Sequence, residues 1–66
     1  MPLIEIHLMQ GRTAQEKKNL LASVTNAVQE SLGAPLKSIR VWIQELSDED
    51  YMVAGVVAAD RKKVSS

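Results

Sequence analysis

The sequence predicts a small α/β (α+β) domain built on one β-α-β unit, and three observations lead to this prediction. Residues 3–9 and 38–46 alternate side chains with the period of two that a half-buried strand requires. Between them, residues 14–32 carry apolar side chains at helical spacing. The order strand, helix, strand favours parallel strands with a right-handed crossover, so residues 1–66 should form a single domain.

The first strand, LIEIHLM, has one purely apolar face and one mixed face. Side chains at even positions are all aliphatic, whereas odd positions mix apolar and polar groups. The apolar face carries Ile4, Ile6 and Leu8, and the mixed face carries Leu3, Glu5, His7 and Met9.

The helix has recognisable start and stop signals. Thr13 and Glu16 have the spacing of a capping box, in which each side chain satisfies a free backbone amide. Gly33 occupies the position of a left-handed C-cap, and Pro35 prevents the helix from continuing. The predicted apolar stripe comprises Leu20, Leu21, Val24, Ala27, Val28, Ser31 and Leu32. The opposite side carries mostly Lys17, Lys18, Asn19, Gln29 and Glu30.

The second strand repeats the design of the first. Ile39, Val41 and Ile43 form an apolar face that the helix should cover, while the other face is mixed. The acidic and polar residues 47–50 predict a turn, and residues 51–57 predict a short C-terminal strand or hairpin. The charged tail, residues 60–66, is expected to be frayed.

Such a unit cannot hide both faces of its sheet. A two-stranded sheet is not independently stable in water, and a chain of 66 residues has a marginal core. Cysteine is absent and His7 is the one histidine, so neither a disulfide nor a metal site is expected to reinforce the domain. The periodicity therefore predicts oligomers in which several copies pack through the mixed faces of their sheets.

The composition disfavours several functional classes. Lys plus Arg and Asp plus Glu both total 8, so the formal net charge is zero and no nucleic-acid or anionic-membrane partner is indicated. No apolar run approaches the ~20 residues that a membrane span needs. The N-terminus lacks the basic and apolar regions of a signal peptide, so a cytoplasmic location is expected.

Pro2 is the first candidate for chemistry. Once Met1 is removed, Pro2 presents a free secondary amine, and an α-amino group titrates near ~8, well below lysine. A neutral amine can take a proton from oxygen or carbon and return it elsewhere. Proline at the second position is, however, common in proteins without any such role.

Two arginines are candidates for binding an anion. Arg12 lies between the first strand and the helix, where it either binds a carboxylate or is a solvated loop residue. Arg40 lies within the second strand on the mixed face, where it needs a ligand or an ion pair with Glu5 or Glu45 across an interface. His7 and Trp42 are most simply interface residues.

These landmarks together resemble the 4-oxalocrotonate tautomerase family. The matching segments are MPLIEIHLMQGRT, the helix around KKNLLASVTNAV, and LGAPLKSIRVWIQEL, so the resemblance covers nearly all of residues 2–51. Pro2, Gly11-Arg12, Ala34-Pro35 and Ile39-Arg40-Val41 all fall at the family's spacing.

The resemblance implies an isomerase that moves a proton in an unsaturated 2-hydroxy or 2-oxo acid, such as a 2-hydroxymuconate-like product of aromatic compound degradation. Pro2 would be the general base, and Arg40 of a neighbouring subunit would polarise the carbonyl or carboxylate end. Arg12 would hold the far carboxylate, while Met9 and Tyr51 would line the pocket. The family needs no cofactor and forms hexamers, so a homohexamer is expected, although some relatives combine two different chains.

Departures from the family pattern keep two alternatives open. Tyr51 replaces the usual phenylalanine, Trp42 is bulkier than expected, and Gly55 is the one glycine of the C-terminal segment. These changes are compatible with a hydratase or dehalogenase of unsaturated acids on the same scaffold. If Met1 were retained, the Pro2 nitrogen would be an amide, and the chain would be a non-catalytic oligomeric module.

Overall fold

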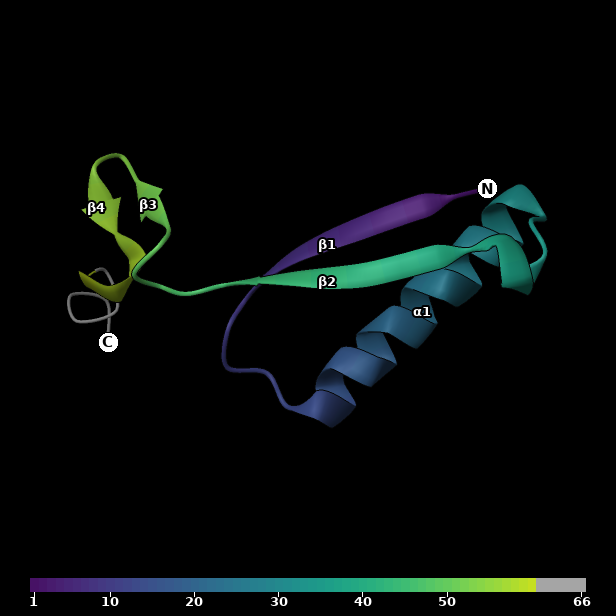
Figure 1. The fold of residues 1–66 in the computed structure, drawn as a ribbon, viewed down its shortest axis with the longest axis horizontal. Helices are drawn as coiled ribbons and strands as arrows, with labels where there is room; N and C mark the ends of the chain where they lie inside the picture. The colour runs from purple at the N-terminus through teal and green to yellow at the C-terminus, as the bar shows by residue number, and fades with distance from the viewer. Residues whose placement is uncertain (61–66) are drawn as a thin grey trace.

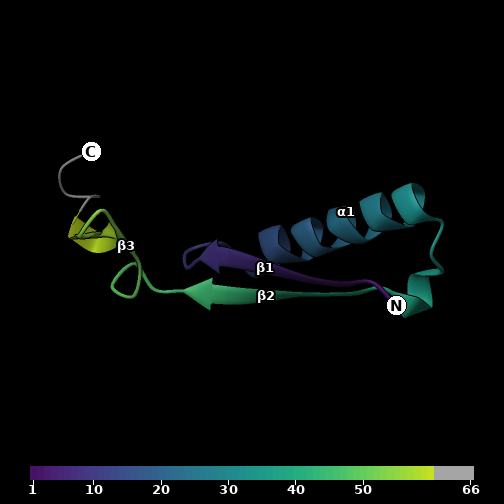
Figure 2. The same cartoon turned by 90° about the horizontal axis from the view of Figure 1, so that it is seen from above.

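The computed structural model describes residues 1–60 and confirms the β-α-β unit. Strands β1 (Leu3–Met9) and β2 (Arg40–Leu46) are parallel and paired along their whole length, from Leu3 opposite Arg40 to Met9 opposite Leu46. Helix α1 (Ala14–Leu32) connects them and lies against one face of the sheet (Figures 1 and 2). The opposite face of the sheet has no cover within the described chain.

Both predicted caps of α1 are present. The Thr13 hydroxyl accepts a hydrogen bond from the Glu16 amide at 3.1 Å, and the Glu16 carboxylate accepts one from the Thr13 amide at 2.9 Å. At the other end, Gly33 adopts the left-handed φ of 68°, and its amide donates to the Gln29 carbonyl at 2.8 Å. Local sequence therefore fixes both ends of the helix.

The second strand begins two residues later than predicted. Leu36–Ser38 form a short 3₁₀ helix, η1, instead of extended chain. Both the amide and the hydroxyl of Ser38 donate to the Pro35 carbonyl, at 2.9 Å and 2.8 Å. The proline-initiated turn therefore delays entry into the sheet until Arg40.

The structure confirms the predicted apolar stripe of α1 only in part. Leu20, Leu21, Val24 and Val28 are half-buried, but Ala27, Ser31 and Leu32 are exposed. Lys17 and Gln29, placed on the solvent side by the sequence, are half-buried instead. The short sheet accounts for this, because two strands cover a narrower strip of the helix than the apolar pattern offers.

A β-hairpin follows the predicted turn at residues 47–50 and stands apart from the sheet and helix (Figure 1). Strands β3 (Met52–Val53) and β4 (Val56–Val57) are antiparallel. Ala54 and Gly55 connect them with φ of 53° and 83°, as in a type I′ turn. The hairpin prediction is thus confirmed, whereas the expected fraying of residues 60–66 concerns mostly residues outside the described part.

Burial is shallow throughout the described chain. Ile39, 9% exposed, is the single apolar side chain of residues 1–60 that is buried. Side chains on the helix-facing side of β1 and β2 are half-buried, as the alternation predicted. No helix among residues 1–60 is both long and apolar enough to cross a membrane. So little burial is difficult to reconcile with a stable isolated monomer.

Candidate active site

Pro2 lies at the N-terminal end of the sheet, next to the start of β2. Its carbonyl accepts a hydrogen bond from the Arg40 amide at 3.0 Å, which extends the β1–β2 ladder by one position. Met1 precedes it at the surface with 80% of its area exposed. The sheet ladder thus holds Pro2 in place, and removal of Met1 would expose its nitrogen at the end of the sheet.

Pro2 and Arg40 are neighbours along the backbone, and strand alternation directs their side chains to opposite faces. Pro2 has the parity of Ile4 and Ile6, which face α1. Arg40 has the parity of Trp42, on the face without a cover.

The Arg40 guanidinium is held in place but lacks an anionic partner in the described chain. Its Nη1 donates to the Lys37 carbonyl at 2.6 Å, a contact made possible by the turn of η1. No carboxylate of residues 1–60 lies within ion-pair distance of it. Glu45, one of the partners considered for Arg40, is instead bound by Lys17 of the same chain.

Arg12 lies at the far end of β1, beside the start of α1. Its Nη1 is 3.6 Å from the Glu16 carboxylate, whose other oxygen accepts from the Thr13 amide. That backbone hydrogen bond, together with the positive charge of Arg12, lowers the pKa of the Glu16 carboxyl. Glu16 therefore stays ionised at neutral pH and gives Arg12 a carboxylate partner within its own chain.

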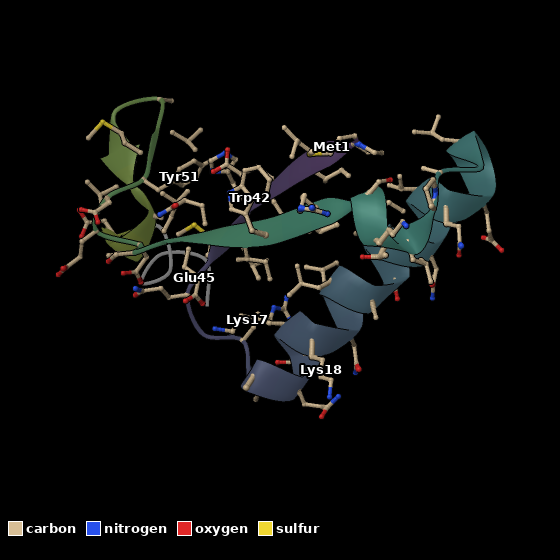
Figure 3. The ribbon with its side chains drawn as sticks, turned by 45° about the vertical axis from the view of Figure 1, so that its right-hand side comes forward. Met1, Lys17, Lys18, Trp42, Glu45 and Tyr51 are labelled. Carbon is tan, nitrogen blue, oxygen red and sulfur yellow. The ribbon has the colours of Figure 1, made fainter. Side chains whose placement is uncertain are left out.

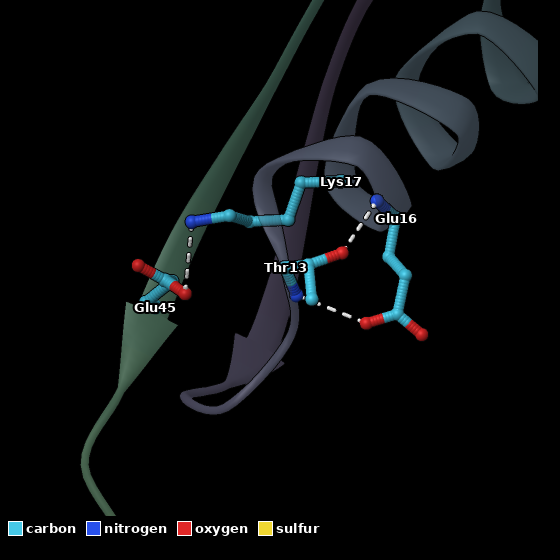
Figure 4. A network of polar contacts seen from close by, with 4 residues as sticks. All are labelled: Thr13, Glu16, Lys17 and Glu45. Atoms are coloured by element: carbon cyan, nitrogen blue, oxygen red, sulfur yellow. Dashed lines mark hydrogen bonds and ion pairs between the residues drawn. The ribbon is translucent and has the colours of Figure 1, made fainter.

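Lys17 makes an ion pair that sequence reasoning missed. Its Nζ lies 3.3 Å from the Glu45 carboxylate and ties the first turn of α1 to the end of β2 (Figures 3 and 4). The available signal was its spacing, because Lys17 precedes Leu20, Leu21 and Val24 on the same helical face. Glu45 likewise shares the helix-facing side of β2 with Val41 and Ile43.

A hollow of about 300 Å³ opens between β1 and the first turns of α1. Leu8 and Leu20 line it with apolar surface, and Arg12, Glu16 and Lys17 border it. Both cations are paired with carboxylates of the same chain. An anionic ligand would therefore find little uncompensated positive charge there.

Met9 and Tyr51 lie at the same end of the sheet as Arg12. Met9 lines a second hollow of about 390 Å³ with Gln10, Gly11 and Asp48. Tyr51, 44% exposed, follows the acidic turn and leads into the hairpin. Figure 3 shows Tyr51 beside the hairpin and Met1 at the start of β1, with Trp42 between the two labels.

The predicted site residues therefore fall into two groups separated by the length of the sheet. A strand of 7 residues spans roughly 20 Å at about 3.3 Å per residue, so Pro2 and Arg12 of one chain cannot meet around a small molecule. His7, placed on the uncovered face, lies 3.8 Å from Glu5 and contributes to neither group.

Comparison with known proteins relates this geometry to a class of enzyme. Residues 2–61 match the model of the family described as tautomerase enzyme. A 2-hydroxymuconate tautomerase of Pseudomonas putida is 42% identical over 60 residues, which cover 91% of this chain and 95% of that protein.

Solved structures agree with this match. A 4-oxalocrotonate tautomerase isozyme of Methylibium petroleiphilum superposes with a TM-score of 0.91 at 38% identity, over 97% of this chain and 100% of that one. A heterohexameric 4-oxalocrotonate tautomerase of Chloroflexus aurantiacus superposes with a TM-score of 0.86 at 28% identity, over 91% and 97%.

The fold and these relatives define a tautomerase, an enzyme of the isomerase class that moves a proton within its substrate. The chain belongs to the 4-oxalocrotonate tautomerase family of the tautomerase superfamily.

Proposed function

We propose that this enzyme isomerises an unsaturated 2-hydroxy or 2-oxo acid, with Pro2 as general base and Arg40 and Arg12 as substrate-binding residues. The observation that carries the proposal is the state of Arg40. Its guanidinium is fixed by the Lys37 carbonyl on an uncovered face, with no carboxylate partner among residues 1–60. A positioned, unpaired guanidinium is suited to binding a carboxylate or a developing enolate.

The proposed reaction is a proton shuttle without net change in composition. The Pro2 nitrogen takes the proton of the 2-hydroxyl group, and the O–H electrons form the carbonyl double bond. The conjugated double bonds shift by one position, and Pro2 returns the proton to the carbon at the end of the conjugated system. Arg40 stabilises the negative charge that develops on the carboxylate and carbonyl oxygens, so no metal or organic cofactor enters the scheme.

The site is proposed to form between copies of the chain. Arg12, Met9 and Tyr51 lie at one end of the sheet and Pro2 at the other, so Pro2 should meet these residues from a neighbouring copy. Arg40 points from the uncovered face, where it can reach a neighbour's substrate.

Exposed apolar surface supports this assembly. Trp42 on the uncovered face is 43% exposed, and Met52, Val53 and Val56 of the hairpin are also exposed. An isolated two-stranded hairpin is marginally stable at best, so contacts with another chain should hold it. We propose a homohexamer. The alternative is an assembly with a second type of chain, as in the heterohexameric relative.

The test combines intact mass with an activity assay. We expect protein made from its native start codon to lack the mass of Met1 and to isomerise a 2-hydroxydienoate. Pro2→Ala should lower kcat/KM about 10²- to 10⁴-fold, the usual contribution of a general base, with the oligomer unchanged in sedimentation. Retained Met1 together with no activity on any enol probe would contradict the proposal. Halide release from a haloacrylate would instead favour the dehalogenase alternative.

A further inference from the structure

The two arginines of the proposed site differ in their charge environment. Arg40 has no carboxylate partner among residues 1–60, whereas Arg12 lies 3.6 Å from Glu16. An arginine that is already paired attracts a second anion less strongly, because the neighbouring carboxylate offsets part of its field. The two ends of a bound substrate should therefore experience different electrostatic environments.

The position of Glu16 is set by the backbone and not only by Arg12. One carboxylate oxygen accepts from the Thr13 amide at 2.9 Å, and the Thr13 hydroxyl in turn accepts from the Glu16 amide (Figure 4). The capping box thus holds the carboxylate beside Arg12 through contacts that a ligand would not disturb. To leave Glu16, Arg12 would have to turn away from a fixed negative charge.

The chain segment at the end of β2 is rich in acidic residues. The Gln10 amide donates to the Leu46 carbonyl at 2.9 Å, so the loop that carries Arg12 lies beside the end of β2. Residues 45–50 contain Glu45, Asp48, Glu49 and Asp50 and no lysine or arginine. Lys17 pairs with the first of these, and Asp48 lines the same hollow as Gln10 and Gly11.

We infer that Glu16 is a specificity-determining residue that makes Arg12 select substrates whose far end is uncharged. The preferred substrate class is then a 2-hydroxydienoate or 2-oxo acid with one carboxylate, which binds at Arg40, and a neutral far group at Arg12. A second carboxylate at the far end is disfavoured. This inference rests on the proposed function, because it assumes that both arginines bind the substrate.

The experiment measures kcat/KM for two 2-hydroxydienoates that share the 2-hydroxy acid end. One has a methyl group at the far end and the other has a carboxylate. The variant is Glu16→Gln, which keeps the capping box because glutamine serves at this position as well as glutamate. Glu30→Gln, which makes the same charge change at an exposed position in the last turns of α1, is the matched control.

We expect Glu16→Gln to raise kcat/KM for the dicarboxylate about two- to five-fold, the range for an exposed ion pair, and to leave the monocarboxylate unchanged. The gain should shrink at 1 M salt, where the Debye length is about 3 Å. It should also shrink in an Arg12→Ala background, because Glu16 acts through Arg12. Glu16→Ala, which also removes the charge, should raise the ratio of kcat/KM for the dicarboxylate to that for the monocarboxylate in the same way.

The inference would be overturned if Glu16→Gln left unchanged or lowered the ratio of kcat/KM for the dicarboxylate to that for the monocarboxylate. An equal change of this ratio in Glu30→Gln would overturn it as well. Pro2→Ala, measured with the same two substrates, separates this failure from failure of the proposed function. If Pro2→Ala is inactive and the Glu16 variants leave the ratio unchanged, only the role of Glu16 is wrong. If Pro2→Ala keeps both activities, the proposed base is wrong as well.

Discussion

A contact to the main chain fixes the side chain of Arg40, which we propose binds the substrate. The 3₁₀ turn η1 presents the Lys37 carbonyl to the guanidinium at 2.6 Å. This contact uses one donor of the planar fork, so the remaining donors are available to bind a carboxylate in two-point geometry. Arginine suits this position better than lysine because lysine offers only a point charge.

We predict that Arg40→Ala lowers kcat/KM about 10²- to 10³-fold, the usual cost of removing a group that stabilises developing charge. Arg40→Lys should recover only part of the loss, because it restores the charge but not the fork. Steady-state kinetics with a 2-hydroxydienoate provide the measurement. Lys37→Ala is the control, since it removes a neighbouring positive charge and keeps the carbonyl that holds Arg40. An equal loss in that control would show that net charge alone is responsible.

At the scale of the element, the stability of the start of α1 depends on pH because the Glu16 carboxyl titrates. The Thr13 amide and Arg12 lower the pKa of this carboxyl in the folded state, so folding favours its ionised form. The resulting stabilisation is present above the unfolded pKa, near the ordinary value of 4.5, and is lost as pH falls through the lower folded pKa. Neutral glutamine at this position cannot show the effect.

We therefore predict that the stability difference between the wild type and Glu16→Gln is largest near pH 7 and disappears at strongly acidic pH. Thermal unfolding followed by circular dichroism at constant protein concentration measures it. Comparison of the two proteins cancels the titration of the other carboxyl groups, which both share. A difference that stays constant from pH 7 to acidic pH would contradict this account of the helix start.

The hairpin carries a residue poorly matched to its backbone. Ala54 has φ of 53°, and the left-handed region costs a residue with a Cβ atom roughly 1–2 kcal/mol. Asparagine followed by glycine is the preferred pair for a type I′ turn. The present pair is alanine followed by Gly55.

We predict that Ala54→Asn stabilises the protein by about 0.5–1 kcal/mol, because asparagine tolerates the left-handed region better than alanine does. The expected observation is a rise in Tm at fixed protein concentration. Ala54→Val is the matched control and should lower Tm, since a β-branched side chain fits a positive φ poorly. If both substitutions shifted Tm equally, the turn would not be the source of the strain.

At the scale of the whole molecule, the sheet separates groups that the proposed chemistry requires together. Its N-terminal end holds Pro2, and its C-terminal end leads to Arg12 and Tyr51. The molecule is correspondingly elongated, with extents of 45 × 24 × 15 Å. Two copies in opposite orientation would place the N-terminal end of one sheet beside the C-terminal end of the other, the arrangement that a twofold axis produces.

We predict that Pro2→Ala and Arg12→Ala, each with lowered activity alone, regain activity when their chains are mixed, unfolded and reassembled. Under twofold symmetry, half of the dimers in an equal mixture contain both variants. One of the two sites in each mixed dimer combines wild-type Pro2 with wild-type Arg12, so about a quarter of all sites are restored. The measurement is kcat per site before and after reassembly. Each variant reassembled alone is the control, and no recovery in the mixture would mean that both residues of one chain serve the same site.

The sequence by itself determined the local structure. Period-two alternation specified both strands, Thr13 with Glu16 specified the start of α1, and Gly33 specified its end. These features depend on contacts within a few residues, so the chain encodes them without reference to the rest of the fold. The resemblance to the family, from which Pro2, Arg12 and Arg40 were chosen as candidates, could also be recognised from residues 2–51 alone. The family model and the relatives confirm the family.

Only the tertiary structure decided which charges are paired and which are free. The Lys17–Glu45 pair joins residues far apart in the sequence, so its formation depends on the crossover that places the first turn of α1 against β2. The same packing exposed Leu32 and buried Gln29 in part, against the apolar pattern. The structure also separated Pro2 from Arg12 by the length of β1, because direction along a strand sets which end of the sheet each residue occupies.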